Sequence, residues 1–178
     1  MRRLALIVST AAVIGALAFA GSSATARTAS TRAGHATTAV SNKRIVLAFL
    51  RDVLAEHHGS HAANYITPNM QFHAGTVGTI VGRANVTGLL SSLVSSIPNL
   101  HPALQDILAQ GNEVMVRLVV TGTLEHPLLG IPGTGQPLRW DAIDLYRLKG
   151  GKIAEEWASE DLTAILNDTG TYKAPWIH

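Results

Sequence analysis

The sequence predicts an α+β domain in which helices cover the concave face of a curved, cone-shaped antiparallel sheet. Two apolar repeats at helical spacing come first along the chain, and three segments with strand patterns follow them. Helices that precede a strand meander commonly pack together on one face of the sheet. A sheet curled in this way can enclose an apolar pocket.

The two helices are predicted from apolar periodicity. Apolar residues recur at three- and four-residue spacing over residues 46–54, after Ser41-Asn42 and before Gly59, which ends the element. The same spacing runs over residues 86–97 and stops at Pro98. Both patterns are typical of helices with one face toward a core.

The strands follow from a change of period. Residues 114–123 form an apolar, β-branched run, residues 138–148 alternate between two faces, and residues 153–159 return after a Gly150-Gly151 turn. We expect residues 65–75 to form a short helix leading into a short strand. Residues 130–136 are rich in turn residues and predict a hairpin loop.

The Gly150-Gly151 turn also predicts which residues of the last hairpin face one another. A tight turn there places Lys149 opposite Lys152 and Leu148 opposite Ile153. Counting outward gives one shared face with four pairs: Tyr146 with Glu155, Asp144 with Trp157, Ala142 with Ser159, and Trp140 with Asp161. Two tryptophans would then flank two aspartates.

Asp161 is therefore a candidate acid–base residue. A carboxylate held against aromatic surface has its charged form disfavoured, so its pKa rises toward the range of useful proton exchange. The alternative is that Asp161 caps the helix suggested by Leu162, Ile165 and Leu166. The local sequence leaves both interpretations open.

Residues 1–26 have the pattern of a signal peptide. Met1-Arg2-Arg3 is basic, residues 4–20 are apolar, and Ala24-Thr25-Ala26 is a small-residue cleavage motif. A membrane anchor is the competing interpretation, although the apolar stretch is short for a span and diluted by Ala and Gly. We expect a secreted, periplasmic or extracellular protein without a stable membrane anchor after cleavage.

The rest of the chain divides into three predicted parts. Residues 27–40 are rich in Ala, Thr and Ser and predict a flexible linker. Residues 41–168 form the domain, and residues 169–178 form a C-terminal tail.

Charge and composition exclude several functions. The chain has 14 Lys and Arg against 12 Asp and Glu, and Arg2 and Arg3 precede the cleavage motif, so the remainder is balanced. Without a basic run, nucleic acid is not an expected partner. The absence of Cys excludes disulfides, thiolate catalysis and Cys-ligated metal.

A histidine-rich segment raises the question of a metal site. His57 and His61 are four residues apart, a spacing that can bind metal on a continuous helix. Gly59 interrupts such a helix, and no acidic ligand is evident nearby. We therefore expect no metal site.

Several further residues are candidates for the pocket wall. Arg117 shares strand parity with Met115 and could enter the pocket to hold a carboxylate or enolate, or form an ion pair on the outer face. The aromatic residues could select a flat, hydrophobic ligand or be ordinary core residues. The predicted substrate-binding set is Phe72, Met115, Arg117, Trp140, Asp144, Tyr146 and Trp157.

The predicted elements resemble the SnoaL-like polyketide cyclases and predicted ester cyclases. These belong to the nuclear transport factor 2-like superfamily, which includes ketosteroid isomerase and scytalone dehydratase. The resemblance covers roughly residues 42–166. It is carried by residues 65–73, Gly122-Thr123 with the loop 130–135, residues 143–147, and residues 151–157.

The resemblance implies acid–base chemistry without metal or cofactor. In characterised cyclases of this family, an aspartate just beyond the tryptophan acts as acid and base in an intramolecular aldol ring closure, and Asp161 matches that position. His73 matches a family histidine that points into the cavity. Leu124 departs from the pattern, because the family often has His there, and residues 165–168 differ from the usual ending.

The resemblance also bears on ligands and partners. It implies a hydrophobic carbonyl compound as substrate and is compatible with a homodimer, since the exposed sheet face often pairs in this superfamily. Tailoring cyclases normally work in the cytoplasm, so the export signal favours an alternative, a secreted module that binds an apolar small molecule without turnover. A third alternative is a structural dimerisation domain with a filled cavity.

Overall fold

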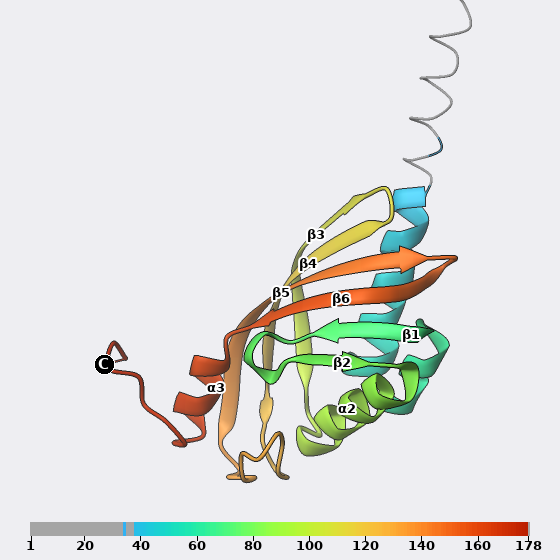
Figure 1. The fold of residues 1–178 in the computed structure, drawn as a ribbon. Helices are drawn as coiled ribbons and strands as arrows, with labels where there is room; N and C mark the ends of the chain where they lie inside the picture. Colours follow the sequence, from blue (N-terminus) through green and yellow to red (C-terminus); the bar gives the residue numbers. More distant parts are fainter. Residues whose placement is uncertain (1–33, 35–37, 178) are drawn as a thin grey trace, which may run out of the picture.

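The computed structural model describes residues 34 and 38–177, and it confirms the predicted α+β class. Six strands form one curved, open sheet in the order β2-β1-β6-β5-β4-β3 (Figure 1). Neighbouring strands are antiparallel except β1 and β6, which are parallel. The predicted signal peptide lies outside the described residues. Among the helices that are described, none combines the length and apolar character that crossing a membrane requires.

The helices begin earlier than their apolar patterns suggest. Residues 38–49 are helical, including the last three residues of the predicted linker, and they continue into a π-helix, η1 (Leu50–Ala55). The second predicted helix is α2 (Arg83–Ser96), which stops before Pro98 as expected. Short 3₁₀ turns, η2 (Gly59–Asn64) and η3 (Gly75–Val77), and a C-terminal helix, α3 (Leu162–Asp168), complete the set.

The three predicted strands correspond to β4 (Glu113–Thr123), β5 (Pro137–Lys149) and β6 (Lys152–Glu160). The segment expected to contain a short helix and a strand is extended as β1 (Ile66–His73). Two further strands were not predicted, β2 (Thr79–Val81) and β3 (His101–Gln110). Both are edge strands without a fully buried residue, so they lack the strong alternation that sequence analysis detects.

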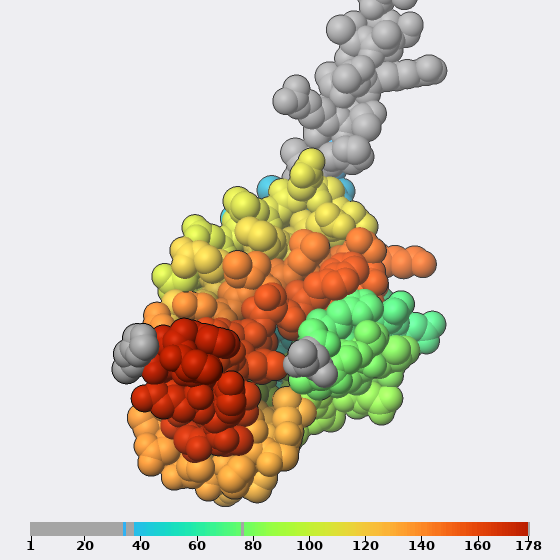
Figure 2. Space-filling model, turned by 60° about the vertical axis from the view of Figure 1, so that its left-hand side comes forward, coloured from blue at the N-terminus to red at the C-terminus, as the bar shows by residue number. Residues whose placement is uncertain are grey.

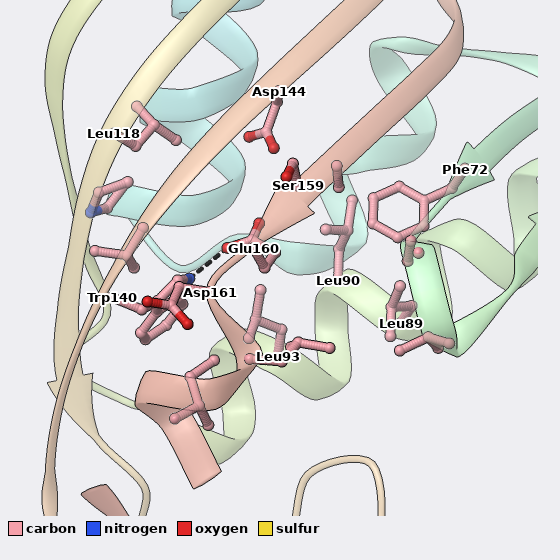
Figure 3. Close-up of a pocket in the computed structure, with 18 of the residues that line it drawn as sticks. Phe72, Leu89, Leu90, Leu93, Leu118, Trp140, Asp144, Ser159, Glu160 and Asp161 are labelled. Atoms are coloured by element: carbon pink, nitrogen blue, oxygen red, sulfur yellow. Dashed lines mark hydrogen bonds between the residues drawn. The ribbon is translucent and has the colours of Figure 1, made fainter. Parts of the chain in front are cut away.

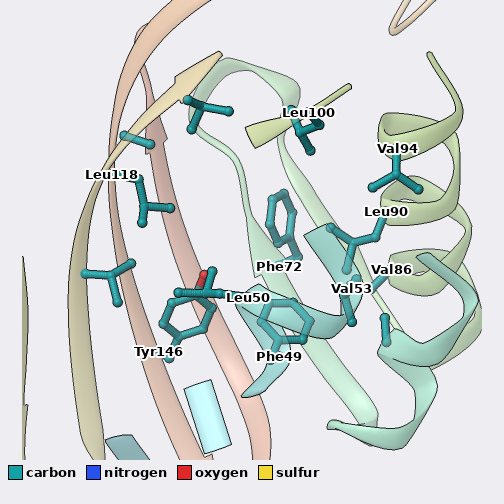
Figure 4. Packing of buried hydrophobic residues seen from close by; sticks show 14 of the residues in the cluster. Phe49, Leu50, Val53, Phe72, Val86, Leu90, Val94, Leu100, Leu118 and Tyr146 are labelled. Carbon is teal, nitrogen blue, oxygen red and sulfur yellow. The ribbon is translucent and has the colours of Figure 1, made fainter. Parts of the chain in front are cut away.

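The core lies between the concave face of the sheet and the two long helical segments. In Figure 4, Phe49 and Val53 point from the N-terminal helix toward the interior, where Leu90 and Val94 of α2 also point. The Phe49 ring meets that of Tyr146 on β5 edge to face, with 6.0 Å between centroids. Each such fully buried apolar side chain contributes about 1.5–3 kcal/mol relative to an exposed one.

Close backbone contact fixes η2 against α2. A β-carbon added at Gly59 would lie 2.5 Å from the Cα atom of Ser91, a distance that real β-carbons essentially never show. Glycine is therefore needed at position 59 because the two backbones are so close. A positive φ angle is not the reason, since Gly59 does not have one.

We predict that Gly59→Ala lowers the free energy of unfolding by about 1–3 kcal/mol, because the two backbones must separate. Gly88→Ala is the matched control on α2, since its added β-carbon meets no atom within 4 Å. That change should raise stability by about 0.5–1 kcal/mol. Urea unfolding followed by circular dichroism measures both, and equal stability of the two variants would contradict the packing argument.

Candidate functional site

A β-bulge in the β5–β6 hairpin determines which residues of β6 face the interior. Leu148 pairs with Ile153 as predicted, but Arg147 pairs with Glu155, so Ala154 is an extra residue. One inserted residue moves every following side chain to the other face of the sheet. The predicted register beyond this point is therefore wrong: Glu156 opposes Tyr146, Ala158 opposes Asp144, and Glu160 opposes Ala142.

The bulge places Trp157 on the outer face, opposite Leu145, and not in the pocket as predicted. Its ring stacks on His73, with 5.2 Å between centroids, and the Arg147 guanidinium lies 4.7 Å from the ring centre. His73 also departs from its predicted place in the cavity. It pairs with Trp157 across β1 and β6, so it faces outward while its neighbour Phe72 is buried inside.

Met115 and Arg117 also lie outside the pocket, contrary to the prediction. On β4 the even-numbered residues, such as Val114 and Val116, are the buried ones, and the odd-numbered residues lie on the other face. Arg117 is exposed and forms an ion pair with Asp106 on β3, with Nη2 2.6 Å from Oδ2. The outer-face alternative for Arg117 is thus the one observed.

The concave side of the sheet encloses a cavity of about 610 Å³. Phe72, Trp140, Asp144 and Tyr146 line it, where the sequence analysis placed them. Most of the remaining wall is aliphatic. It includes Leu89, Leu90 and Leu93 of α2 and Leu118 of β4 (Figure 3). Leu162 and Ile165 of α3 also contribute. The space-filling view is hollowed between the green β1–β2 segment and the red α3 segment (Figure 2).

Two carboxyl groups are buried deep in this apolar wall. Asp144 and Glu156 are only 4% and 5% exposed. Asp144 Oδ1 and Glu156 Oε2 have no hydrogen-bond partner, while the Tyr146 hydroxyl donates to Asp144 Oδ2 at 3.4 Å. Burial, followed by repulsion from neighbouring carboxylates, holds the pKa of both groups well above the ordinary range. The two are therefore disposed to carry protons.

Glu160 is a third carboxyl group on the same wall, and its environment differs. Its Oε2 accepts a hydrogen bond from Trp140 Nε1 (Figure 3). Dense surrounding protein raises its pKa, whereas the Trp140 bond opposes that rise by favouring the ionised form. Unlike the two deeper groups, Glu160 keeps accessible surface. It can therefore meet a ligand in the cavity.

Asp161 fulfils the capping interpretation and also lines the cavity. Its Oδ1 accepts a hydrogen bond of 3.1 Å from the Ala164 amide, which makes it the N-cap of α3. Its own amide donates to the Asp141 carbonyl at 3.0 Å, so the backbone is fixed at the end of the sheet. The exposed side chain lies near Trp140 and Glu160 in Figure 3.

Glu156 and Glu160 are the residues that the sequence analysis missed. The hairpin register was counted without an insertion, so neither residue was among the four pairs predicted on the shared face. Ala154, the bulged residue, carries no turn or glycine signal that marks an insertion. The warning available in the sequence was the density of carboxylates, three in the six residues 155–160.

The arrangement combines an apolar cavity with buried proton donors, Asp144 and Glu156, and with accessible carboxyl groups, Glu160 and Asp161. Cavities of several hundred Å³ with few polar groups are typical of small-molecule sites. Carboxyl groups whose surroundings favour different protonation states can act as an acid and base pair.

Comparisons with known proteins agree with this fold. A family model described as SnoaL-like polyketide cyclase matches residues 44–169. No match was found among curated proteins.

Several solved structures have the same fold, and the similarity extends over nearly the whole length of each of those chains. A protein from Jannaschia sp. CCS1, provisionally assigned as a SnoaL-like polyketide cyclase, is 22% identical with a TM-score of 0.67, over 76% of this chain and 95% of that one. AclR from Streptomyces galilaeus, provisionally assigned as a hydroxylase, is 20% identical with a TM-score of 0.66, over 75% and 98%. A Catenulispora acidiphila protein with a ketosteroid isomerase-like fold is 19% identical with a TM-score of 0.61, over 75% and 97%.

The buried carboxyl groups make stability depend on pH. A pKa that is raised by folding means that the folded state binds protons more tightly than the unfolded state. The stability that these two groups contribute should therefore be fully present below their unfolded pKa values of about 4, and should be lost as the pH rises through the raised folded values.

We predict that Glu156→Gln removes part of this slope and raises the free energy of unfolding at pH 8 by about 1–3 kcal/mol, the range for a buried polar group without a partner. Glu155→Gln is the matched control, because Glu155 lies on the outer face and pairs with Arg147 at 2.6 Å. Glu155→Gln should lower the free energy of unfolding by up to about 1 kcal/mol. Denaturant unfolding from pH 4 to pH 9 measures the free energy of unfolding of both variants. If the pH dependence of this free energy is unchanged in Glu156→Gln, the assignment of Glu156 as a buried acid is wrong.

Proposed function

The chain belongs to the SnoaL-like polyketide cyclase family, and we propose that it is a cofactor-independent cyclase-type enzyme acting on a hydrophobic carbonyl compound. The reaction class is an aldol-type ring closure or a related isomerisation. The observation that carries the proposal is the set of three carboxyl groups, Asp144, Glu156 and Glu160, in the wall of an apolar cavity. Burying Asp144 and Glu156 in an apolar wall is costly, so their presence there favours a chemical use.

Glu160 takes the proton in this mechanism. The protein packed around Glu160 raises its pKa, which makes it a stronger base than an ordinary carboxylate. The Trp140 bond fixes its orientation, and its accessible surface leaves an oxygen for the substrate. It removes a proton from the carbon α to a carbonyl. The resulting enolate attacks a second carbonyl, which forms the C–C bond, and Glu160 returns the proton to the new alkoxide.

The protonated carboxyl groups stabilise the charge that develops on oxygen. A carboxylic acid kept neutral by an apolar site can donate a hydrogen bond to an enolate. Asp144 lines the cavity next to Tyr146, whose hydroxyl donates to it and fixes its orientation. Phe72 and Trp140 supply flat apolar walls that orient the ligand.

Asp161 holds the position that the family resemblance assigns to the acid–base aspartate. Its Oδ1 is engaged by the Ala164 amide, which orients the carboxylate at the cavity wall. We place Asp161 beside Glu160 as a second proton-transfer group. His73 has no place in this mechanism, because its ring packs against Trp157 on the outer face.

Two observations support a second candidate, a non-catalytic binding module with the same cavity. The sequence pattern of residues 1–26 favours export. In addition, the Asp161 cap gives that residue a structural role that needs no chemistry. We propose secretion for either function, and detection of the processed chain outside the cytoplasm tests it.

We predict that the protein exchanges the α-protons of an apolar aromatic ketone for deuterium, with 2-acetonaphthone in D₂O as the probe and NMR as the readout. Removal of the base in Glu160→Gln should slow exchange by about 10²–10⁴-fold, the usual contribution of a positioned base. Asp161→Asn should retain the cap, because Asn is also a preferred cap residue, while slowing exchange if Asp161 transfers protons.

Asp141→Asn is the matched control, because Asp141 is an exposed carboxylate on β5 that points away from the cavity. The Asp141→Asn variant should exchange the α-protons of the ketone at the same rate as the unsubstituted protein. Saturable binding of the ketone without exchange would favour the binding module. Full exchange in both Glu160→Gln and Asp161→Asn would exclude the mechanism described above.

A further inference from the structure

Away from the cavity, Asp52, His58 and His61 bring three ligand-type atoms together. Asp52 lies on η1, His58 directly precedes η2, and His61 lies within η2. The Nδ1 atoms of His58 and His61 are each 2.9 Å from the same atom, Oδ1 of Asp52. All three ligand atoms lie within 4.8 Å of one another, and none of these residues lines the cavity.

The shared carboxylate is held in place from its other side. The Tyr65 hydroxyl donates to Oδ2 of Asp52 at 2.8 Å, and the Tyr65 ring packs on Phe49 with 5.9 Å between centroids. Oδ1 is thereby directed at the two histidines. Contacts from His58, His61 and Tyr65 thus converge on this one carboxylate.

We propose that Asp52, His58 and His61 form a binding site for a divalent transition-metal ion of the Zn²⁺ type. Two imidazole nitrogens and one carboxylate oxygen are a donor set suited to such ions, and a hydrogen-bonded carboxylate is the usual arrangement around them. Oxygen-only ions such as Mg²⁺ and Ca²⁺ fit this donor set less well.

The geometry requires only small movements to accept the ion. Bonds of about 2.0–2.2 Å in a tetrahedral site separate the ligand atoms by roughly 3.3–3.5 Å. This value falls between the 2.9 Å nitrogen–oxygen distances and the 4.8 Å upper limit of the cluster. The side chains of His58 and His61 are half exposed, so they can adjust and water can complete the coordination. Glu56 Oε2, 3.9 Å from His58 Nδ1, is a further oxygen within reach.

The site differs from the histidine pair considered in the sequence analysis. His57 is excluded, because its Nε2 is engaged by the Leu100 carbonyl at 2.9 Å. His57 also has a positive φ of 60°, which reverses the chain and brings the following residues back toward Asp52. The acidic ligand was overlooked because the sequence analysis ended the helix at Gly59, whereas η1 ends at Ala55 and the chain turns at His57.

A bound ion would join the end of η1 to η2. Phe49 and Leu54 on the same helical segment line the cavity, so the bound ion would stabilise one wall of the cavity. Ligands that bind only the folded state raise its stability in proportion to the logarithm of their concentration. Metal binding should therefore be visible as an increase in Tm.

We predict that Zn²⁺ binds the full chain, purified without a polyhistidine tag and stripped with EDTA, in one equivalent measured by titration calorimetry. His58→Ala and His61→Ala should each weaken binding at least 10-fold and abolish the Zn²⁺-dependent increase in Tm. Tyr65→Phe keeps all three ligands but frees the carboxylate, and it should weaken binding by about 10–100-fold. Visible absorption of the Co²⁺-loaded protein provides an independent coordination signature.

His126→Ala is the matched control, because His126 is an exposed histidine outside the cluster. It should leave Zn²⁺ affinity unchanged. If no heat or Tm change accompanies Zn²⁺, or if His126→Ala weakens binding as much as His58→Ala, the cluster is a hydrogen-bonded turn and the proposal is wrong. These outcomes are independent of α-proton exchange in the cavity.

Discussion

The single extra residue in β6 is the constraint on which the cavity depends. Without Ala154, Trp157 would fill the interior opposite Asp144, and Glu156 and Glu160 would face outward. The bulge replaces a bulky aromatic residue with carboxyl groups and the small Ala158. It also increases the local twist, as bulges generally do, and this favours the curvature of the sheet around the cavity.

The same shift produces a polar cluster on the outer face. Trp157 lies between His73 and Arg147, and Glu155 accepts hydrogen bonds from both of these residues, at 3.2 Å and 2.6 Å. Such contacts remain partly solvated and contribute modestly to stability. They nevertheless connect β1, β5 and β6, and so they help to hold the parallel β1–β6 pair beside the hairpin.

The interior carries an energetic conflict that the fold tolerates. Asp144, Glu156 and Glu160 are close enough to disfavour one another's charges, and two of their oxygens have no partner. The apolar packing of the N-terminal helix and α2 against the sheet must offset this cost, because the stability of a domain is a small difference between large terms. A ligand with a carbonyl oxygen would relieve the conflict by accepting hydrogen bonds from the protonated groups.

The sequence by itself determined the fold class, the central strands and the apolar faces of both long helices, because these depend on periodicity over ten residues or more. It also placed Trp140, Asp144 and Tyr146 in the cavity, since the alternation along β5 is uninterrupted. Only the tertiary structure decided which side of β6 faces inward and which two histidines meet Asp52. Both results depend on single-residue changes in backbone path, a bulge at Ala154 and a positive φ at His57, which local composition does not encode.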